Sequence, residues 1–206
     1  VCDMAIDFFF CKTKVNLMRA FAGESQARNR YTIAAEAAKD QGFYAVQQIF
    51  LFTAEQERAH ARRFYDLLKN ISGNTVEIAG GYPVDHYDSV IELLRAAEYN
   101  ELEEYGDVYQ VFGKEAKEEG LIEAASTFFQ IAEIEAVHGR RFGKMAELLE
   151  KNKYFESDQN NRWMCLNCGY IHTGKMVPGV CPVCRQDRGY FIPAELAPYL
   201  GYNFVQ

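Results

Sequence analysis

The sequence of 206 residues contains no long apolar run and no excess of basic residues. A transmembrane helix needs about 20 consecutive apolar residues, so we expect no membrane span. Lys and Arg together number 22 against 29 Asp and Glu, which gives a net charge of −7 at pH 7. A protein that binds nucleic acid would carry a basic face, so no nucleic-acid partner is expected. The opening apolar stretch is short and includes an acid, unlike a signal peptide, and we expect a cytoplasmic protein.

Histidine is scarce, and its positions are informative. Two of the four histidines lie in a ten-residue pattern that occurs twice, as EQERAHARRF at 55–64 and as EIEAVHGRRF at 133–142. Each copy has a glutamate three residues before the histidine, Glu57 before His60 and Glu135 before His138. The repetition predicts two similar halves with one shared chemical role.

Residues 12–150 are rich in Ala, Glu, Leu, Gln and Lys, with apolar residues at helical spacing. Breaks at Gly42, at 72–88 and at Gly120 divide them into four helices of about 27 to 30 residues each. Short first and third connections favour antiparallel hairpins, and the long second connection favours a crossover. We therefore predict a mainly α protein, in which residues 1–151 form a four-helix bundle with a long crossover between helices 2 and 3.

Cysteine is concentrated near the C-terminus. Residues 152–162 are polar and are interpreted as a linker, and residues 163–206 as a small domain that needs a metal to fold. Two CxxC pairs supply its four thiolates, and this spacing suits either zinc or a single iron. No role is assigned to Cys2, Cys11 or the tail 192–206. The predicted ligands are Cys165, Cys168, Cys181 and Cys184.

Acidic residues complete the helical pattern. Residues three apart share one helical face, so each histidine points the same way as its glutamate, and Glu98 and Glu101 share a face of the third helix. Five carboxylates brought together away from water would be forced to protonate, whereas two divalent cations would neutralise them. Oxygen ligands with two imidazoles suit iron or manganese. The predicted set is Glu24, Glu57, His60, Glu98, Glu101, Glu135 and His138.

One alternative is that these acids lie on exposed helical faces, as a single Glu-x-x-His usually does. Two copies in register, each with an upstream glutamate on another helix, favour the metal site instead. The first helices also match, because Tyr31 lies seven residues after Glu24 and Tyr105 lies seven residues after Glu98. The repeat therefore covers both helices of each half.

The motifs AFAGESQARNRY, EQERAH and EAVH, followed by the cysteine pairs, resemble the rubrerythrin family. The resemblance implies a ferritin-like four-helix domain with two non-haem irons and a rubredoxin-like domain with one iron, for which zinc is a possible substitute. It implies that Glu57 and Glu135 bridge the irons, that Glu24 and Glu98 are terminal ligands, and that His138 holds one iron.

The resemblance also implies three catalytic residues. The second iron would move between Glu101 and His60 as its redox state changes, and Tyr31 would hydrogen-bond to the ligands. A second tyrosine of the family does not align, because Gly106 falls at its position with Tyr105 beside it.

The function implied by the resemblance is reduction of hydrogen peroxide to water in defence against oxidative stress. An external donor, such as rubredoxin or an NAD(P)H-dependent reductase, would supply electrons one at a time through the four-cysteine iron. A head-to-tail homodimer would bring that iron to the neighbouring subunit's di-iron site. Two alternatives remain, namely an iron-handling, ferritin-like ferroxidase and a non-enzymatic protein with zinc at its cysteines.

Overall fold

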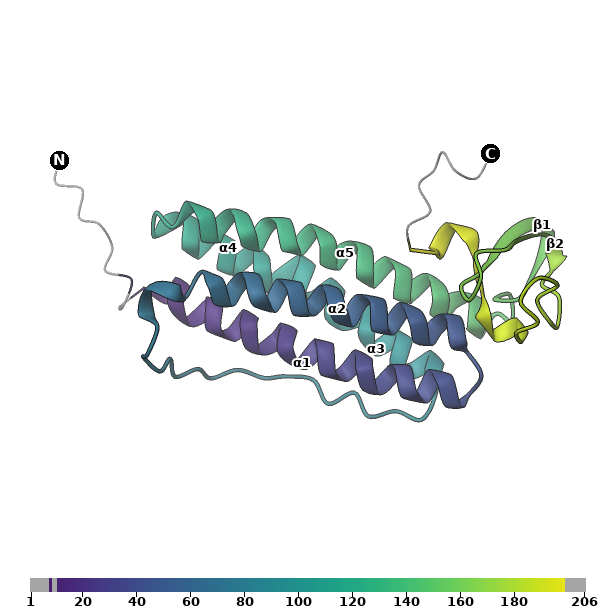
Figure 1. Ribbon diagram of the computed structural model, residues 1–206. Coiled ribbons are helices and arrows are strands. Elements are labelled where there is room, and N and C mark those ends of the chain that lie inside the picture. Colours follow the sequence, from purple (N-terminus) through teal and green to yellow (C-terminus); the bar gives the residue numbers. More distant parts are fainter. Residues whose placement is uncertain (1–7, 9–10, 199–206) are drawn as a thin grey trace.

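The computed structural model describes residue 8 and residues 11–198 (Figure 1). Helices α1 (Lys12–Asp40) and α2 (Tyr44–Asp66) form one antiparallel hairpin, and a short 3-10 helix, η2 (Lys69–Ile71), follows them. The second hairpin consists of α3 (Val90–Glu103), η3 (Glu104–Val108) and α4 (Tyr109–Glu118), which pack against α5 (Ile122–Glu150). The connection between the hairpins runs along the length of the bundle (Figure 1). The predicted four-helix architecture with a long crossover is confirmed.

Local interactions determine where the helices begin and end. The N–H of Ile91 donates to Ser89 Oγ at 3.2 Å at the start of α3, and the N–H of Lys14 donates to Cys11 Sγ at 3.3 Å at the start of α1. Gly42 and Gly120 adopt φ values of +77° and +74°, which residues with a Cβ rarely adopt. Both hairpins therefore turn at the glycines expected from the sequence.

The second hairpin departs from a simple repeat of the first. The sequence predicts one regular helix between the crossover and Gly120, but the five residues Glu104–Val108 form a π-helical turn, η3. A π turn inserts one extra residue, so every residue after it is displaced by about 100° from the α-helical register. The faces of α3 and α4 therefore cannot be read from one continuous helical pattern.

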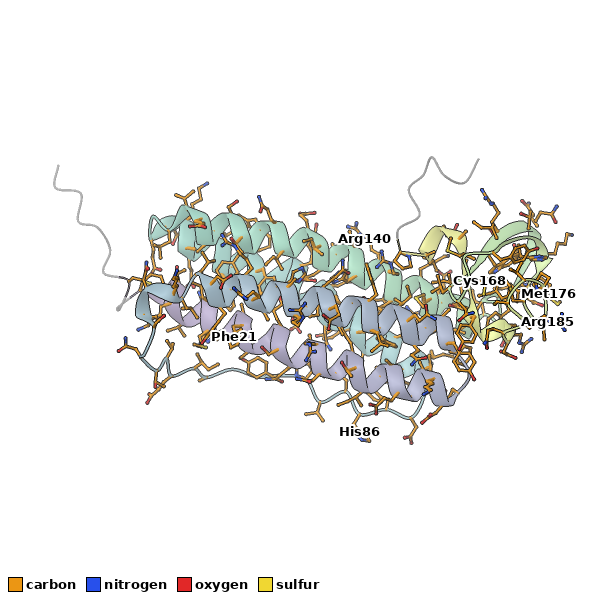
Figure 2. All side chains as sticks on the ribbon, in the orientation of Figure 1. Phe21, His86, Arg140, Cys168, Met176 and Arg185 are labelled. Atoms are coloured by element: carbon orange, nitrogen blue, oxygen red, sulfur yellow. The ribbon has the colours of Figure 1, made fainter. Side chains whose placement is uncertain are left out.

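The core of the bundle has two apolar regions with a polar layer between them. Tyr31, Phe50 and Phe142 belong to the region nearer the C-terminal domain, and Phe64 and Phe128 to the other. Figure 2 shows side chains filling the bundle along its length. Aromatic packing on both sides holds the polar layer rigidly and keeps water out. No helix in the described ranges is both long enough and apolar enough to cross a membrane.

The C-terminal domain is built on a three-stranded antiparallel sheet in the order β2-β1-β3. Its core contains the fully buried Trp163 and Phe191, with Tyr170 packed against them. Its elements are β1 (Glu156–Cys165), β2 (Ile171–Met176), the 3-10 helix η4 (Arg188–Tyr190), β3 (Phe191–Pro193) and the 3-10 helix η5 (Ala194–Leu196).

The junction between the domains is packed. Tyr44 at the start of α2 stacks on Tyr190, with ring centroids 4.5 Å apart, and Tyr154 is buried in the apolar region of the bundle. Residues 152–162, expected to be a linker, therefore differ from that expectation, because they include Tyr154 and the first part of β1. Cys2 and the end of the tail, residues 199–206, lie outside the described residues.

Candidate metal centres

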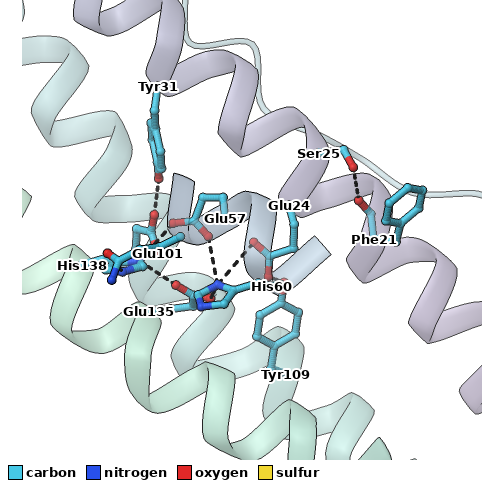
Figure 3. A network of polar contacts seen from close by, with 11 residues as sticks. Phe21, Glu24, Ser25, Tyr31, Glu57, His60, Glu101, Tyr109, Glu135 and His138 are labelled. Carbon is cyan, nitrogen blue, oxygen red and sulfur yellow. Dashed lines mark hydrogen bonds and ion pairs between the residues drawn. The ribbon is translucent and has the colours of Figure 1, made fainter. Parts of the chain in front are cut away.

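Four helices contribute to the polar layer of the bundle (Figure 3). Glu24 lies on α1, Glu101 on α3, and the two Glu-x-x-His pairs on α2 and α5. The structure brings together six of the seven predicted helical ligands in two overlapping groups, within each of which the ligand atoms lie within 4.8 Å of one another. The groups are Glu24, Glu57, His60 and Glu135, and Glu57, Glu101, Glu135 and His138.

Glu57 and Glu135 belong to both groups, because each directs one carboxylate oxygen to either side. Glu57 lies 3.1 Å from His60 Nδ1 through Oε2 and 3.1 Å from His138 Nδ1 through Oε1. Glu135 lies 2.9 Å from His60 Nδ1 through Oε1 and 2.8 Å from His138 Nδ1 through Oε2. Two carboxylates with this orientation could bridge a pair of cations.

Burial makes this cluster unfavourable without a cation. Glu24 and Glu135 are 0% exposed and Glu101 is 2% exposed. The pKa of Glu24 is raised well above its ordinary value by burial and then by the charges of Glu135 and Glu57. The same causes raise the pKa of Glu101. Both groups therefore hold their protons more strongly than an exposed glutamate does, unless positive charge is supplied.

In the protein without metal, the histidines supply that positive charge. Burial lowers the pKa of His60, but close contacts with Glu135 and Glu57 outweigh it and raise the pKa to about 9. His138 responds to burial in the same way, and its carboxylate neighbours raise its pKa to about 12. Burial raises the pKa of Glu57, but close contacts with both histidines lower it to about 2.

The donor set fits two divalent cations. Buried atoms without a hydrogen-bond partner include Glu24 Oε2, Glu57 Oε1, Glu101 Oε2, both carboxylate oxygens of Glu135, and His138 Nδ1. Buried polar atoms normally have partners, and these atoms all belong to the two overlapping groups. Hard oxygen donors with one imidazole on each side are suited to iron or manganese.

Metal loading is expected to release protons. At pH 7 the imidazoles of His60 and His138 are both protonated, and each must lose one proton before it can bind a cation. About two protons should therefore leave the histidines, and Glu24 and Glu101, whose pKa values are raised, should add to the release. Raising the pH through about 9 should remove the contribution of His60, because it is then already neutral. Calorimetric titration of metal-free protein with Fe²⁺ or Co²⁺, in buffers of different ionisation enthalpy, measures the release. A metal-loading heat independent of the buffer would contradict this prediction.

Two tyrosines connect the carboxylates across the bundle. Tyr31 donates a hydrogen bond to Glu101 Oε1, as the resemblance implied for Tyr31. Tyr109, which the sequence analysis missed, donates to Glu24 Oε1 at 2.5 Å. Tyr31 follows Glu24 by seven residues, whereas Tyr109 follows Glu101 by eight, and the extra residue is the π insertion. This one-residue insertion changed the spacing from seven to eight residues and hid the match.

Glu98 is a correction to the predicted ligand set. Its carboxylate is partly exposed and accepts a hydrogen bond from Arg95 Nη1 at 2.6 Å, and it belongs to neither group of ligand atoms. Glu101, one helical turn further on, takes the place expected for Glu98. The matching of Tyr105 with Tyr31 led to the error, because it assumed a regular helix where η3 interrupts it.

The implied exchange between Glu101 and His60 also differs from the geometry. Glu101 lies with His138 in one group, and His60 lies with Glu24 in the other. Glu104, in the π turn, is the further acid on the side of His60. Burial and then Glu135 and Glu57 raise its pKa well above the ordinary value, while the charges of Arg30 and then of His60 oppose this shift. The signal in the sequence is its spacing of three residues after Glu101.

Gln56 holds the ring of His138. An amide oxygen can only accept, so His138 Nε2 donates to Gln56 Oε1 at 3.0 Å, and Nδ1 faces the carboxylates. This hydrogen bond selects the tautomer that a metal at Nδ1 requires.

Substituting Gln56 is therefore expected to weaken metal binding. A Gln56→Leu variant should bind its metal pair about 10- to 100-fold more weakly, because such orienting partners commonly have that effect. Gln56→Glu keeps an acceptor and should restore binding, and Gln48→Leu on the same helix is the control. Competition with a chelator measures the affinities, and equal affinities for Gln56→Leu and Gln48→Leu would refute the role of Gln56.

The four predicted cysteines converge in the C-terminal domain, with their sulfur atoms within 4.8 Å of one another. The Cys165–Cys184 and Cys168–Cys181 sulfur distances are 3.7 and 3.8 Å, so the thiols are not joined as disulfides. Four thiolates in one cluster fit a tetrahedral site for iron or zinc.

Backbone turns wrap the sulfurs. Gly169, which follows the first CxxC pair, has a φ of +79°. Arg185 follows the second CxxC pair and has a φ of +64°, so an arginine there adopts a conformation usually taken by glycine. The backbone N–H of Gln186 donates to the sulfur of Cys184 and lowers the pKa of that thiol to about 6. The second turn therefore provides its sulfur with a hydrogen bond despite the missing glycine.

Comparison with known proteins agrees with this geometry. Residues 15–146 match the rubrerythrin family, and residues 163–192 match the rubredoxin-like domain of rubrerythrin. The rubrerythrin of Porphyromonas gingivalis is 43% identical over 184 residues, which cover 89% of this chain and 90% of that protein. Rubrerythrin-1 of Clostridium acetobutylicum is 45% identical and covers 87% of this chain and 93% of that protein.

Solved structures show the same arrangement. Nigerythrin in a fully reduced, all-ferrous state matches with a TM-score of 0.61 and 28% identity, covering 94% of this chain and 91% of that chain. A Desulfovibrio desulfuricans bacterioferritin matches with a TM-score of 0.61 and 22% identity over 69% of this chain and 82% of that chain, which shows the shared bundle fold alone. The chain belongs to the rubrerythrin family, with a ferritin-like bundle followed by a rubredoxin-like domain.

Proposed function

We propose that this protein is a peroxidase that reduces hydrogen peroxide to water at a di-iron centre in the bundle. The observation that carries the proposal is the pair of carboxylates, Glu57 and Glu135, each directed to both histidines and buried with unpaired oxygens. Two ferrous ions bound there would supply the two electrons that cleave the O–O bond.

The chain's own residues orient the donors and exclude water. Tyr31 donates a hydrogen bond to Glu101 and Tyr109 donates one to Glu24, so each tyrosine orients one carboxylate. The apolar regions on both sides of the layer keep the site at low polarity, where charge interactions are strong. Burial raises the pKa of Glu104, which favours its protonated form and suits it to donate a proton near the centre.

We also propose that Glu104, rather than Glu101, is the carboxylate that exchanges with His60. Two features support this proposal. Glu104 and His60 interact electrostatically on the Glu24 side of the centre. Glu104 also lies in a π turn, a rare helical form that occurs frequently at functional sites.

The four-cysteine iron would return electrons from an external donor, and the spacing favours a partner subunit. Tyr44 contacts the C-terminal domain through Tyr190, and Glu57 lies thirteen residues further along α2, which corresponds to about 20 Å. Cys168 lies at the end of the molecule, away from the middle of the bundle (Figure 2). Such a separation is too long for rapid single-step electron transfer, so we propose a head-to-tail homodimer.

Anaerobic stopped-flow mixing tests the peroxidase. Iron-loaded, reduced protein should be oxidised by hydrogen peroxide at least about tenfold faster than by dioxygen. A tenfold ratio corresponds to an activation free energy that is lower by about 1.4 kcal/mol for peroxide. Metal analysis and a visible spectrum accompany the experiment, since ferric iron at four thiolates is red and zinc is colourless. Equal or faster oxidation by dioxygen would instead favour a ferroxidase and refute the peroxidase.

A further inference from the structure

A cavity of about 290 Å³ lies between the crossover connection and the bundle. Its outer wall is the exposed segment Ala79–Pro83, and its bundle wall includes Gly23 of α1 and Asn100 of α3. The space is bounded on one side by chain without regular structure and on the other by rigid helices.

The inner end of the cavity reaches the metal centre. Glu104 and Tyr109 line it, and they are directly connected to the metal-ligand cluster. Tyr109 donates to Glu24 Oε1 at 2.5 Å, and Glu104 interacts with Glu135 and Glu57. A molecule in the cavity would therefore contact two side chains that interact with the ligand cluster.

Arg30 brings unpaired hydrogen-bond donors to the cavity wall. Its Nε and Nη1 atoms are buried without a hydrogen-bond partner, and its side chain is 16% exposed. The nearest acid, Asp85, lies 3.6 Å from Nε, beyond hydrogen-bonding distance, and accepts instead from Asn100 Nδ2 at 2.7 Å. Buried donors without partners are uncommon in folded proteins, so these two atoms suit an oxygen-bearing ligand.

The crossover is tethered at the mouth of the cavity. Arg19 Nε donates to the carbonyl of Ala79 at 2.9 Å, and Tyr82 Oη donates to the carbonyl of Arg19 at 3.4 Å. Gly80 and Gly81 lie between these tethers. The ring of Tyr82 also faces Gly23, where an added Cβ would lie 3.9 Å from the ring. This distance is an ordinary van der Waals contact, so only a side chain larger than that of alanine at position 23 would press against Tyr82.

We propose that this cavity, bounded by the crossover and by Arg30, is the entry and holding site for the peroxide substrate of the di-iron centre. The inference rests on the proposed function and adds the route and a binding residue. Arg30 donates to a peroxide oxygen, and the Gly23–Tyr82 constriction limits the size of the organic group that a hydroperoxide can carry.

Rates with small and large peroxides test the route. Gly23→Leu should lower the second-order rate constant of iron oxidation about tenfold for hydrogen peroxide and about 100-fold for tert-butyl hydroperoxide, because steric exclusion grows with substrate size. Gly23→Ala should leave both rates close to those of the wild type, because its Cβ would lie 3.9 Å from the Tyr82 ring without a clash. Tyr82→Ala widens the mouth and should raise the tert-butyl hydroperoxide rate relative to hydrogen peroxide, whereas Tyr87→Ala, elsewhere on the crossover, should leave that ratio unchanged.

A binding measurement tests Arg30 independently of activity. Zinc-loaded protein does not turn over, so hydrogen peroxide can be titrated while the Arg30 Nε–H resonance is followed by ¹⁵N NMR. This resonance should shift with saturation, and that of Arg28 on the same helix should not. In the iron protein, Arg30→Met should lower the hydrogen peroxide rate constant about tenfold through loss of a charge-assisted hydrogen bond, and Arg28→Met is the control.

The outcomes separate this inference from the proposed function. Unchanged ratios of the two peroxide rates in both Gly23→Leu and Tyr82→Ala, or an Arg30 resonance that does not respond to peroxide, would overturn the cavity as the entry site, even for an active peroxidase. A wild-type protein that reacts no faster with peroxide than with dioxygen would refute the function, and the NMR titration would still decide whether the cavity binds peroxide.

Discussion

A Glu101→Gln variant is expected to lose the cation on the His138 side of the centre. Its peroxidase rate should fall at least about 1,000-fold, because no other group at the site can replace that cation in stabilising the charge that develops in the transition state. Glutamine keeps the size of the side chain and can accept the hydrogen bond from Tyr31. It removes the negative charge that lies 3.4 Å from His138 Nδ1. Metal analysis and single-turnover oxidation measure the two losses.

The same variant should make the metal-free protein more stable. Burial and the neighbouring carboxylates raise the pKa of Glu101 in the folded state above its value in the unfolded chain. The folded protein therefore holds this proton more strongly, and the free energy of unfolding falls as the pH rises above the unfolded pKa. Glutamine has no such proton to lose, and the midpoint of thermal unfolding at pH 7 should rise by a few degrees. A lower midpoint for metal-free Glu101→Gln than for the wild type would contradict this reasoning.

Glu98→Gln is the matched control, one helical turn earlier on α3. Glu98 pairs with Arg95 outside both groups of ligand atoms, so its substitution removes only a partly exposed ion pair, which usually contributes less than about 1 kcal/mol. Both cations and the peroxidase rate should be retained. Metal loss in Glu98→Gln with retention in Glu101→Gln would reverse the assignment of the two acids.

A Cys184→Ser variant is expected to lose iron from the C-terminal domain and to reduce steady-state peroxidase turnover by at least about 100-fold, since electrons can no longer return to the di-iron centre. Oxidation of the pre-reduced bundle in a single turnover should remain close to the wild-type rate, because the six helical ligands are untouched. Comparing the two rates separates electron supply from the reaction with peroxide.

Cys11→Ser is the control for Cys184→Ser. Cys11 is a buried free thiol whose sulfur accepts from the N–H of Lys14 at the start of α1, and serine is a good helix-capping residue. Both rates should be unchanged. If Cys184→Ser retained full steady-state turnover, electrons would have to reach the centre by a path that bypasses the four cysteines.

Much of the site could be predicted from the sequence because helical periodicity determines which residues share a face. The Glu57–His60 and Glu135–His138 pairs point inward as their spacing of three predicts. The two CxxC pairs predicted the cysteine cluster for a similar reason, since a short turn brings both thiols of a pair to the same side. These predictions required only local geometry.

Residues of the third helix were the exception. The match of Glu98 and Tyr105 to Glu24 and Tyr31 assumed uniform helical register between α3 and α4, whereas η3 inserts a residue after Glu101 and brings Tyr109 to the centre. A π turn has no strong sequence pattern, because its cost is met by tertiary contacts and ligand binding rather than by local propensity. Periodicity alone therefore found Glu101 but also included Glu98, which lies outside the centre.

The sequence by itself determined the four-helix bundle, the crossover, the cysteine module and the two paired carboxylate–histidine motifs, because all of these follow from local spacing and composition. Only the tertiary structure decided that Glu98 lies outside the centre and Glu104 beside it, that Tyr109 binds Glu24, and that the crossover encloses a cavity beside Arg30. The physical reason is that packing between distant segments decides both of these features. Such packing sets the helical register on the far side of a π turn, and it sets the path of a connection that has no periodic pattern.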